Sequence, residues 1–596
     1  MAEVVAAKSL AEAVVSAAMA RCLPAPLSGR DPVVRPSEHA DFQSNAALSL
    51  ARQAGTAPRT LARSLQRELA GAPVSAVLSG PGFLNLTLPD STLWGLVAAR
   101  LADDRLGVGT PQSGIRTVVD YSGPNVAKEM HVGHLRTTVI GDCLVRVLAF
   151  LGGEVVRQNH LGDWGTSFGM LIQYLDEHPE TAWHKGGDGP SADCPTDPGP
   201  AGPADRVTAL DALYRAARAR FRSDPGFVER SRLRVVALQA GEEPTLSVWR
   251  ELVEVSTAAF QQLYDRLGVR LTPQDADPES ARNPVLAEIV ETLVAAGIAV
   301  ESQGALCVFF DDVTGPDGEP VPLIVRKQDG GYGYAATDLA TLRHRVEALA
   351  ADRILYVVDA RQALHFRMVT ATARRAGWLP DRVDAVHVPF GTVMGPGGKP
   401  FQTRSGATVR LSELLDAAVD GARAAITDKP HSLSAAELEQ VVAAAGIGAV
   451  KYADLSTSRA KNYVFDIEQM VSLHGDTGVY LQYTHARIRS ILSRAATEVA
   501  PVDTAQPLHP TERALVLLLD GFAGVLEEVA AESEPHRLCG HLFALAKAFT
   551  DFYGACPVLK APTAGSRANR LALCRLTGST LALGLDLLGL QAPERM

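Results

Sequence analysis

The chain has 596 residues, of which 46% are hydrophobic and 21% are charged, and its formal net charge at pH 7 is −10. The length predicts about three to four domains, and the composition is typical of a globular protein with a large core. The negative charge excludes a protein that attracts nucleic acid or an anionic membrane through its overall charge. Any polyanionic partner must therefore be held by local basic faces.

The N-terminal sequence and the cysteines give no sign of secretion or of a metal site. Glu3 and Glu12 interrupt the apolar residues of the first segment, which predicts an amphipathic helix rather than a signal peptide. No stretch reaches about 18 uninterrupted apolar residues, so we expect a soluble cytoplasmic enzyme with no membrane partner. The seven cysteines are scattered without a C-x-x-C pair, so we expect neither a disulfide framework nor structural zinc.

Residues 1–112 have the pattern of a separate α+β domain. Helical patterns in "QSNAALSLARQ" and "APRTLARSLQRELA" alternate with strand-like runs in "VSAVLSGPGFLNLTL", and the segment closes on the turn-rich "GVGTPQSG".

Residues 113–450 have the pattern of a parallel-sheet domain. The strand-like "RTVVDYS" is followed by a Gly-Pro-Asn break, a helix over about 130–151 and a second strand in "GGEVVRQNH", which together predict a βαβ unit. An insertion at about 184–320 begins with the Pro- and Gly-rich residues 185–205, which we expect to form a flexible surface segment, and continues with charged helices. The parallel-sheet pattern then resumes in "PLIVRK", "DRILYVV" and "DAVHVPF".

The remaining residues, 451–596, are almost entirely helical in pattern and predict a terminal bundle.

The stretch "KEMHVGH" stands where the first of these strands ends and its helix begins, which is where parallel sheets bind ligands. His131 and His134 lie on one face of the first helical turn, near the positive end of the helix dipole. Gly133 leaves room for a flat ring against the backbone, and Lys128 adds a cation. The pattern predicts an anion site. A metal pair is the alternative, but no third ligand stands at a convincing distance in the sequence.

Several longer strings carry a family resemblance. "HVGH" resembles the first signature of class I aminoacyl-tRNA synthetases, and "SGPNVAKEMHVGHLRTTVIGD" followed by "NHLGDWGTSFGMLI" resembles the arginyl-tRNA synthetases. The resemblance runs in the family's order through "DFQSNAA", "GPGFLNL", "DGGYGYAATDLA", "DARQALHF", "GKPFQTRSG", "GVYLQYTHARIRSI" and "APERM". It covers nearly the whole chain except the Pro- and Gly-rich insertion.

The resemblance implies a fold and an activity. The fold is a Rossmann-like parallel-sheet catalytic domain with an inserted helical region, an N-terminal α+β domain that contacts tRNA, and a C-terminal all-α domain that binds the anticodon. The activity is that of an ATP-dependent, AMP-forming arginine–tRNA ligase, which makes arginyl-adenylate and passes arginine to the 3′ terminal adenosine of tRNA(Arg). We expect Mg²⁺ as the ATP counterion, no metal held by the protein, and a monomer. Neither step needs a protein nucleophile, so the protein supplies positioning and charge stabilisation.

The resemblance assigns a phosphate side to the site. The second class I signature, a mobile loop, falls on "MGPGGKPFQTRSG", which lacks the usual second lysine, and Lys128 takes over its charge. This segment is no Walker A loop, because Lys399 is followed by Pro400. The expected catalytic residues are His131, His134, Lys128, Lys399 and Arg404. The expected ATP-binding residues are Gly133, His134, His365, Phe366, Val393, Met394, Lys399 and Thr403. The alternatives are a solvated basic loop for Lys399 and Arg404 and a core role for His365 and Phe366.

A guanidinium group is planar, permanently charged and carries five donors, so its pocket needs a carboxylate and further acceptors. The arginine-binding residues that the resemblance implies are Ser122, Asn125, Tyr334, Asp338, Gln362, His160 and Asp163. The alternatives are a helix cap for Asp338 and a core position for Tyr334. A pocket that pairs every donor rejects analogues that lack them, so we expect no editing domain.

Candidate tRNA contacts lie in both terminal domains. Tyr480, Tyr483 and Arg487 follow i, i+3, i+7 spacing on one predicted helix, and such a face suits the unpaired bases and phosphates of an anticodon loop. The resemblance places contacts with the tRNA elbow around Phe42 and Asn45. For Tyr480, Tyr483 and Arg487 singly, the alternative is a core tyrosine or a solvated arginine.

Three interpretations compete. They are a housekeeping arginyl-tRNA synthetase, a specialised paralogue that supplies a biosynthetic pathway or confers inhibitor resistance, and a non-catalytic tRNA-binding relative. The intact His131, His134, Lys128 and Asp338 argue against the third. The small H-x-G-H nucleotidyltransferases are excluded by the length of the chain and by its terminal helices.

Overall fold

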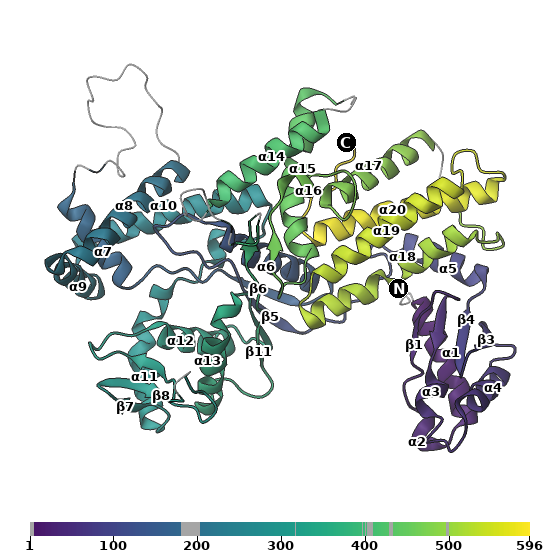
Figure 1. Ribbon diagram of the computed structural model, residues 1–596, viewed down its shortest axis with the longest axis horizontal. Helices are drawn as coiled ribbons and strands as arrows, with labels where there is room; N and C mark the ends of the chain where they lie inside the picture. The colour runs from purple at the N-terminus through teal and green to yellow at the C-terminus, as the bar shows by residue number, and fades with distance from the viewer. Residues whose placement is uncertain are drawn as a thin grey trace.

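We analysed a computed structural model of the protein, which describes residues 5–179, 181, 203–315, 318–395, 397–399, 401, 409–427, 433–495 and 500–596. Figure 1 shows a small N-terminal domain at one end, helices α7–α10 at the other, and the C-terminal helices packed beside a central sheet. Most of the Pro- and Gly-rich segment 185–205 lies outside the described residues, so its expected flexibility stays a prediction.

The N-terminal domain is the predicted α+β unit. Four antiparallel strands pair in the order β1 (Val34–Pro36), β2 (Phe42–Ser44), β4 (Phe83–Thr87) and β3 (Ser75–Ser79). Its helices are α1 (Ala7–Cys22), α2 (Ala25–Ser28), α3 (Ala46–Leu50) and α4 (Pro58–Glu68). Helix α4 is strongly amphipathic and buries Leu61, Ala62 and Leu65, so its apolar face closes the core of this domain.

Ion pairs fix the N-terminal domain and the following helix α5 (Asp90–Leu101) to helix α18 (Pro510–Glu532). Arg513 lies 2.6 Å from Asp41 and 2.5 Å from Asp90. On the next turns of α18, Asp520 pairs with Arg100 at 2.6 Å and accepts a hydrogen bond from the backbone N–H of Ala7 at 2.9 Å.

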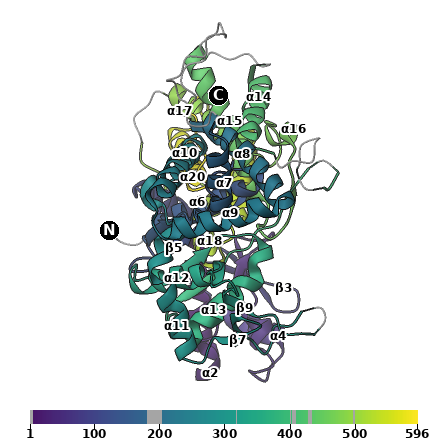
Figure 2. The same cartoon turned by 90° about the vertical axis from the view of Figure 1, so that its left-hand side faces the viewer.

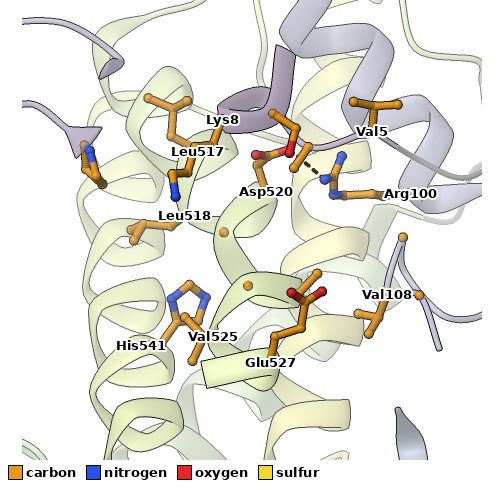
Figure 3. A pocket seen from close by; sticks show the side chains of 18 of the residues that line it. Val5, Lys8, Arg100, Val108, Leu517, Leu518, Asp520, Val525, Glu527 and His541 are labelled. Atoms are coloured by element: carbon orange, nitrogen blue, oxygen red, sulfur yellow. Dashed lines mark ion pairs between the residues drawn. The ribbon is translucent and has the colours of Figure 1, made fainter. Parts of the chain in front are cut away.

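A hollow of about 1690 Å³ lies beside the Asp520 pair, between the N-terminal domain, the residues after α5 and α18. Its lining residues include Lys8, Arg100, Leu517, Asp520, Glu527 and His541 (Figure 3). None of its lining residues belongs to the strand-end loops of the catalytic sheet.

The second domain is built on the predicted parallel sheet. Its order is β11 (Asp384–His387), β10 (Arg353–Tyr356), β5 (Arg116–Asp120) and β6 (Glu154–Gln158), with every neighbouring pair parallel. Helix α6 (Val132–Phe150) connects β5 to β6 and confirms the predicted βαβ unit. All residues from 135 to 148 on α6 are buried.

One strand prediction was wrong. The stretch "PLIVRK" forms β9 (Leu323–Arg326), which pairs antiparallel with β8 (Ala305–Val308) in a separate sheet with β7 (Val300–Ser302). Along β9 the residues alternate between buried and exposed, and this one-sided burial suits an antiparallel sheet rather than a covered parallel one. Helices α11 (Leu286–Ala295), α12 (Tyr334–Glu347) and α13 (Ala363–Arg375) share an apolar core with these strands.

The inserted region is a helical unit with its own core. It contains α7 (Thr166–Glu177), α8 (Pro203–Ser223), α9 (Pro225–Gln239) and α10 (Glu243–Leu267). Figure 2 shows these helices standing above the α11–α13 lobe.

The C-terminal part of the chain is the predicted helical bundle. Its helices are α16 (Ile467–Met470), α17 (Gly478–Ala495), α18, α19 (His536–Ala555) and α20 (Ala564–Leu587). Helices α14 (Leu411–Thr427) and α15 (Ala435–Ser456), which pack with them, begin within the range 113–450 that was predicted for the parallel-sheet domain. Helix α15 runs across the expected domain boundary at residue 450, and the boundaries stay predictions. Helices α14, α15, α18 and α20 all contact α6, so the bundle completes the burial of the helix that starts with H-x-G-H. No helix in the described part of the chain is long and apolar enough to cross a membrane.

Candidate active site

Two loops meet at the carboxyl ends of β5 and β6. Asn125 pairs with Gly162 in a parallel bridge, with hydrogen bonds from Val126 N to Gly162 O at 3.0 Å and from Gly162 N to Pro124 O at 3.2 Å. Asn125 is exposed, and its side-chain Oδ1 is so close to Gly162 that a Cβ at residue 162 would lie 2.1 Å from it. The two loops therefore form one wall of the expected strand-end crevice.

The two histidines cap the N-terminus of α6. His131 Nδ1 accepts a hydrogen bond from Gly133 N at 3.0 Å, and His134 Nδ1 accepts one from His131 N at 3.1 Å. Since Nδ1 is the acceptor in both neutral rings, each carries its proton on Nε2. Burial, with a smaller effect from His131, lowers the pKa of His134 to about 3, and burial followed by the charge of Lys128 also lowers the pKa of His131. Both rings are thus neutral donors at the positive end of a helix.

Gly133 makes this cap possible. A Cβ at residue 133 would lie 2.8 Å from Cε1 of His131, so the His131 ring occupies the space over the glycine. The expected contact between Gly133 and adenine stays a prediction.

Lys128 lies between the crevice and the inserted helices. Its Nζ is 4.6 Å from the ring centroid of Tyr214 on α8. Burial would raise the pKa of Tyr214, but a hydrogen bond with Ser167 and the charge of Lys128 lower it. In the part of the chain that the structure describes, the ammonium group has an aromatic face beside it and no carboxylate partner, which leaves its charge available to a phosphate.

The segment after the expected mobile loop lies beside H-x-G-H. Val132 N donates to Val409 O at 3.2 Å, and Leu411 N donates to Met130 O at 3.0 Å. The Glu129 carboxylate pairs with Arg410 at 2.6 Å. Residues 409–411, which follow the expected second signature in the chain, are therefore adjacent to H-x-G-H in space.

Within the expected mobile loop, Thr403 and Arg404 lie outside the described residues. Val393 and Met394 form β12, which pairs with β13 (Tyr463–Val464), and Lys399 is exposed.

Asp338 and Tyr334 lie on the first turns of α12. Asp338 Oδ2 is 2.6 Å from Nε2 of His365, so this histidine contacts the expected guanidinium-binding carboxylate. Tyr334 is 73% exposed, which rules out the alternative of a core tyrosine. Phe366 is buried, and its ring centroid lies 4.7 Å from that of Tyr356, which agrees with the alternative of a core position for Phe366. Gln362 is exposed at the end of the short helix η4 (Ala360–Gln362).

Two of the expected arginine-binding side chains are hydrogen-bonded within the protein. The buried Ser122 Oγ is 2.8 Å from the Tyr264 hydroxyl and 2.9 Å from that of Thr138. The Asp163 carboxylate accepts hydrogen bonds from N and Oγ of Ser280, at 2.9 and 2.5 Å. These contacts shape the loops, and direct binding of arginine by the two side chains stays a prediction.

His160 belongs to a buried charge network beneath the crevice. Burial would lower its pKa, but the carboxylates of Asp277, at 3.5 Å, and of Asp120 raise it to about 9. The fully buried Arg345 lies 2.9 Å from Asp120 and 3.3 Å from Asp277. Sequence patterns missed Asp120, Asp277 and Arg345, because only the fold brings these three segments together.

Glu279, the first residue of the short helix η3 (Glu279–Val285), was not predicted from the sequence. Burial raises its pKa to about 7, and the charges of Asp338 and Asp163 add to this effect against that of His160. Partial desolvation of the hydroxyl, followed by the charge of Glu279, raises the pKa of the largely exposed Tyr334, which indicates that the two groups lie in one region. Within the described ranges, no hydrogen bond or ion pair reaches the Glu279 carboxylate. The signal in the sequence was an acid after the turn-forming "DADP", inside the expected insertion.

The expected tRNA contacts lie outside the crevice. On α17, Tyr483 is 41% exposed, the Arg487 guanidinium lies 4.7 Å from the Tyr553 ring centroid, and Tyr480 contacts Phe543. In the N-terminal domain Phe42 is buried, and Asn45 precedes α3. Of the residues that the structure describes, no three His, Cys, Asp or Glu side chains are grouped so as to hold a metal ion.

Models of three protein families match the chain. Residues 97–187 and 199–467 match the class I tRNA synthetase (R) catalytic domain, residues 481–596 match the DALR anticodon binding domain, and residues 7–88 match the arginyl tRNA synthetase N-terminal domain. The sheet, its strand-end histidines and these matches define a class I aminoacyl-tRNA synthetase.

Whole-chain comparisons narrow the class. An arginine–tRNA ligase of Frankia casuarinae is 62% identical over 589 residues, covering 98% of both chains, and one of Streptomyces avermitilis is 51% identical, covering 95% of both. The chain belongs to the arginyl-tRNA synthetase family. The solved arginyl-tRNA synthetase of Thermus thermophilus is similar with a TM-score of 0.78 at 25% identity, covering 99% of this chain and 100% of that one. That of Plasmodium falciparum has the same fold, with a TM-score of 0.81 at 24% identity and 99% coverage of both chains. These relatives support the main interpretation and not the specialised or non-catalytic alternatives.

Proposed function

We propose that this chain activates L-arginine with ATP and transfers the arginyl group to tRNA(Arg), with the guanidinium held between Asp338 and Glu279. The charges of Glu279 and Asp338 both raise the pKa of Tyr334, and the charge of Asp338 adds to the effect of burial on the pKa of Glu279, which supports two carboxylates in one region. No ion pair in the described residues gives the Glu279 carboxylate a cation. A guanidinium supplies that cation together with a fork of donors for carboxylate oxygens. His365, 2.6 Å from Asp338, orients the first carboxylate.

On the side of the site that binds the phosphates of ATP, the protein supplies two neutral histidine donors and one lysine cation. The Nε2–H groups of His131 and His134 stabilise oxygens of the α-phosphate as the arginine carboxylate attacks it, and Lys128 supplies positive charge. Such preorganised donors act where charge develops in the transition state. The reaction needs no protein nucleophile, since the carboxylate of arginine attacks and pyrophosphate leaves.

The nitrogen donors on this side do not fit Mg²⁺, which prefers carboxylate, phosphate and water oxygens. The ion would therefore be held by the phosphate oxygens of ATP rather than by these side chains. Lys399 adds a further cation on the phosphate side. Thr403 and Arg404 lie outside the described residues, and their expected part there stays a prediction.

The tRNA is held by both terminal domains. The exposed ring of Tyr483 and the Tyr553-stacked guanidinium of Arg487 favour α17 as the surface for the anticodon loop. The N-terminal domain, with Asn45 at the start of α3, takes the tRNA elbow. The enzyme acts as a cytoplasmic monomer.

The test is arginine-dependent exchange of labelled pyrophosphate into ATP, measured with and without tRNA(Arg). We expect exchange with arginine and none with lysine or citrulline, because citrulline lacks the cation and lysine lacks the planar fork. Absence of arginine-dependent exchange under both conditions would refute the proposal.

A further inference from the structure

Helix α10, in the inserted region, makes hydrogen bonds to both strand-end loops of the site. Trp249 Nε1 donates to Asp163 O at 2.8 Å, and Ser256 Oγ accepts from Ala127 N at 3.0 Å. The Tyr264 hydroxyl is 2.8 Å from Ser122 Oγ and accepts from Asn159 Nδ2 at 3.0 Å. These three side chains are separated by about two helical turns each, so they recur along the side of α10 that faces the sheet.

The loop after β5 has an unusual backbone at the two places where α10 reaches it. Ser122 has φ 75° and Ala127 has φ 62°, and neither is a glycine. A Cβ disfavours the left-handed region, because it approaches the following carbonyl oxygen. Such residues persist only where the surrounding structure holds them.

The hydrogen bonds from α10 reach the same two residues of the loop that have a left-handed backbone conformation. Ser256 binds the backbone N–H of Ala127, and Tyr264 binds the side chain of Ser122. Asn125 lies between Ser122 and Ala127 in the chain and is exposed at the crevice. Lys128, the cation expected to bind phosphate, directly follows Ala127. Neither α10 contact reaches the crevice itself, since Ser256 is fully buried and Tyr264 is 2% exposed.

We propose that Ser256 and Tyr264 are positioning residues, through which α10 holds the loop after β5 in its left-handed conformation and so places Asn125 and Lys128 for the reaction. This inference rests on the proposed function. It gives the inserted helices a part in amino-acid activation, although none of their side chains is assigned to a substrate.

Ser256→Ala has a closely matched control in the next residue. Ser256 donates to Leu252 O at 2.7 Å and Thr257 donates to Val253 O at 2.8 Å, but only Ser256 also binds the loop. We expect S256A to lower the exchange kcat about fivefold, because one hydrogen bond to the strained loop is lost. We expect the kcat of T257A to stay within about twofold of wild type. Equal losses in the two variants would overturn the inference, and so would an unaffected S256A.

A rescue separates loop conformation from general stability. Glycine adopts left-handed φ readily, so Ala127→Gly removes the strain that the hydrogen bond of Ser256 offsets. We expect A127G alone to be near wild type and S256A/A127G to recover to within about twofold of it. A double variant as impaired as S256A would show that Ser256 does not act through Ala127.

Tyr264→Phe tests the other contact with a different kinetic signature. The phenyl ring keeps the packing, while Ser122 and Asn159 lose their shared partner. We expect the KM for arginine to rise about fivefold with little change in the KM for ATP, whereas a partly unfolded enzyme would lose kcat without this split. Equal changes in both KM values would contradict the inference. Wild-type exchange is the reference throughout: its absence refutes the proposed function, and its presence with unchanged variants refutes only the role of α10.

Discussion

Glu279→Gln is expected to remove a pH dependence of arginine binding. In the free enzyme burial raises the pKa of Glu279 to about 7, and a guanidinium binds the ionised carboxylate. With that pKa, about one in eleven molecules is ionised at pH 6 and about ten in eleven at pH 8, so the KM for arginine should fall about tenfold over this range. His160, whose pKa is raised to about 9, stays largely protonated over the same range.

The effect on stability has the opposite sign. Because the folded state raises the pKa of Glu279 from 4.5 to about 7, it binds more protons than the unfolded state between these values. Stability from this group is therefore present below pH 4.5 and is lost as the pH rises toward 7. Arginine restores it by pairing with the carboxylate.

The assay is pyrophosphate exchange at saturating ATP, with arginine titrated at pH 6, 7 and 8. E279Q should show a high KM that hardly varies with pH. The control is E288Q on α11, whose exposed carboxylate pairs with Arg343 at 2.8 Å, and it should follow wild type. A wild-type KM that is flat or rises with pH, or an E279Q variant that keeps the wild-type profile, would refute the assignment of Glu279.

Three further changes have defined outcomes. Lys128→Ala should lower the exchange kcat/KM for ATP about 10- to 150-fold, as expected for about 1.5 to 3 kcal/mol from a charged hydrogen bond, and a near-normal rate would show that this lysine does not supply the missing charge. Gly162→Ala should raise the KM for arginine, because the new Cβ would lie 2.1 Å from Oδ1 of Asn125, and an unchanged KM would separate Asn125 from arginine binding. Arg513→Met should reduce the free energy of unfolding by about 3 kcal/mol in urea titrations, since it leaves the buried Asp41 without its cation, and a change below about 1 kcal/mol would contradict that account.

The elements that could be predicted from the sequence are those with local periodicity. The apolar strand, the break and the helix after it gave the βαβ unit, and the helix was found within about two residues of its observed ends, 132 and 150. The stretch that forms β9 was wrongly assigned to the parallel sheet, because the sequence of a short apolar strand does not indicate which strand it pairs with. Its alternating burial only becomes visible once the separate sheet is in place.

In the candidate site too, residues in contiguous motifs could be predicted, and residues that only the fold brings together could not. Residues in contiguous motifs, such as His131 and His134, were found with their neighbours, although their mutual capping depends on ring orientations that no sequence pattern specifies. Glu279 was missed because its role depends on burial beside Asp338, which is far away in the chain. The predicted contact of Ser122 with arginine stays a prediction, but no sequence pattern indicated that its hydroxyl lies 2.8 Å from that of Tyr264 in the insertion.

The burial of α6 has a consequence for how the molecule unfolds. Every residue from 135 to 148 is buried, and part of that cover comes from α15, α18 and α20 of the C-terminal bundle. Removing the bundle would expose the apolar sides of α6 to water and so withdraw a large part of the hydrophobic free energy that keeps the catalytic sheet folded. The catalytic domain and the bundle therefore form one cooperative unit, which should melt in a single calorimetric transition and resist separation by limited proteolysis.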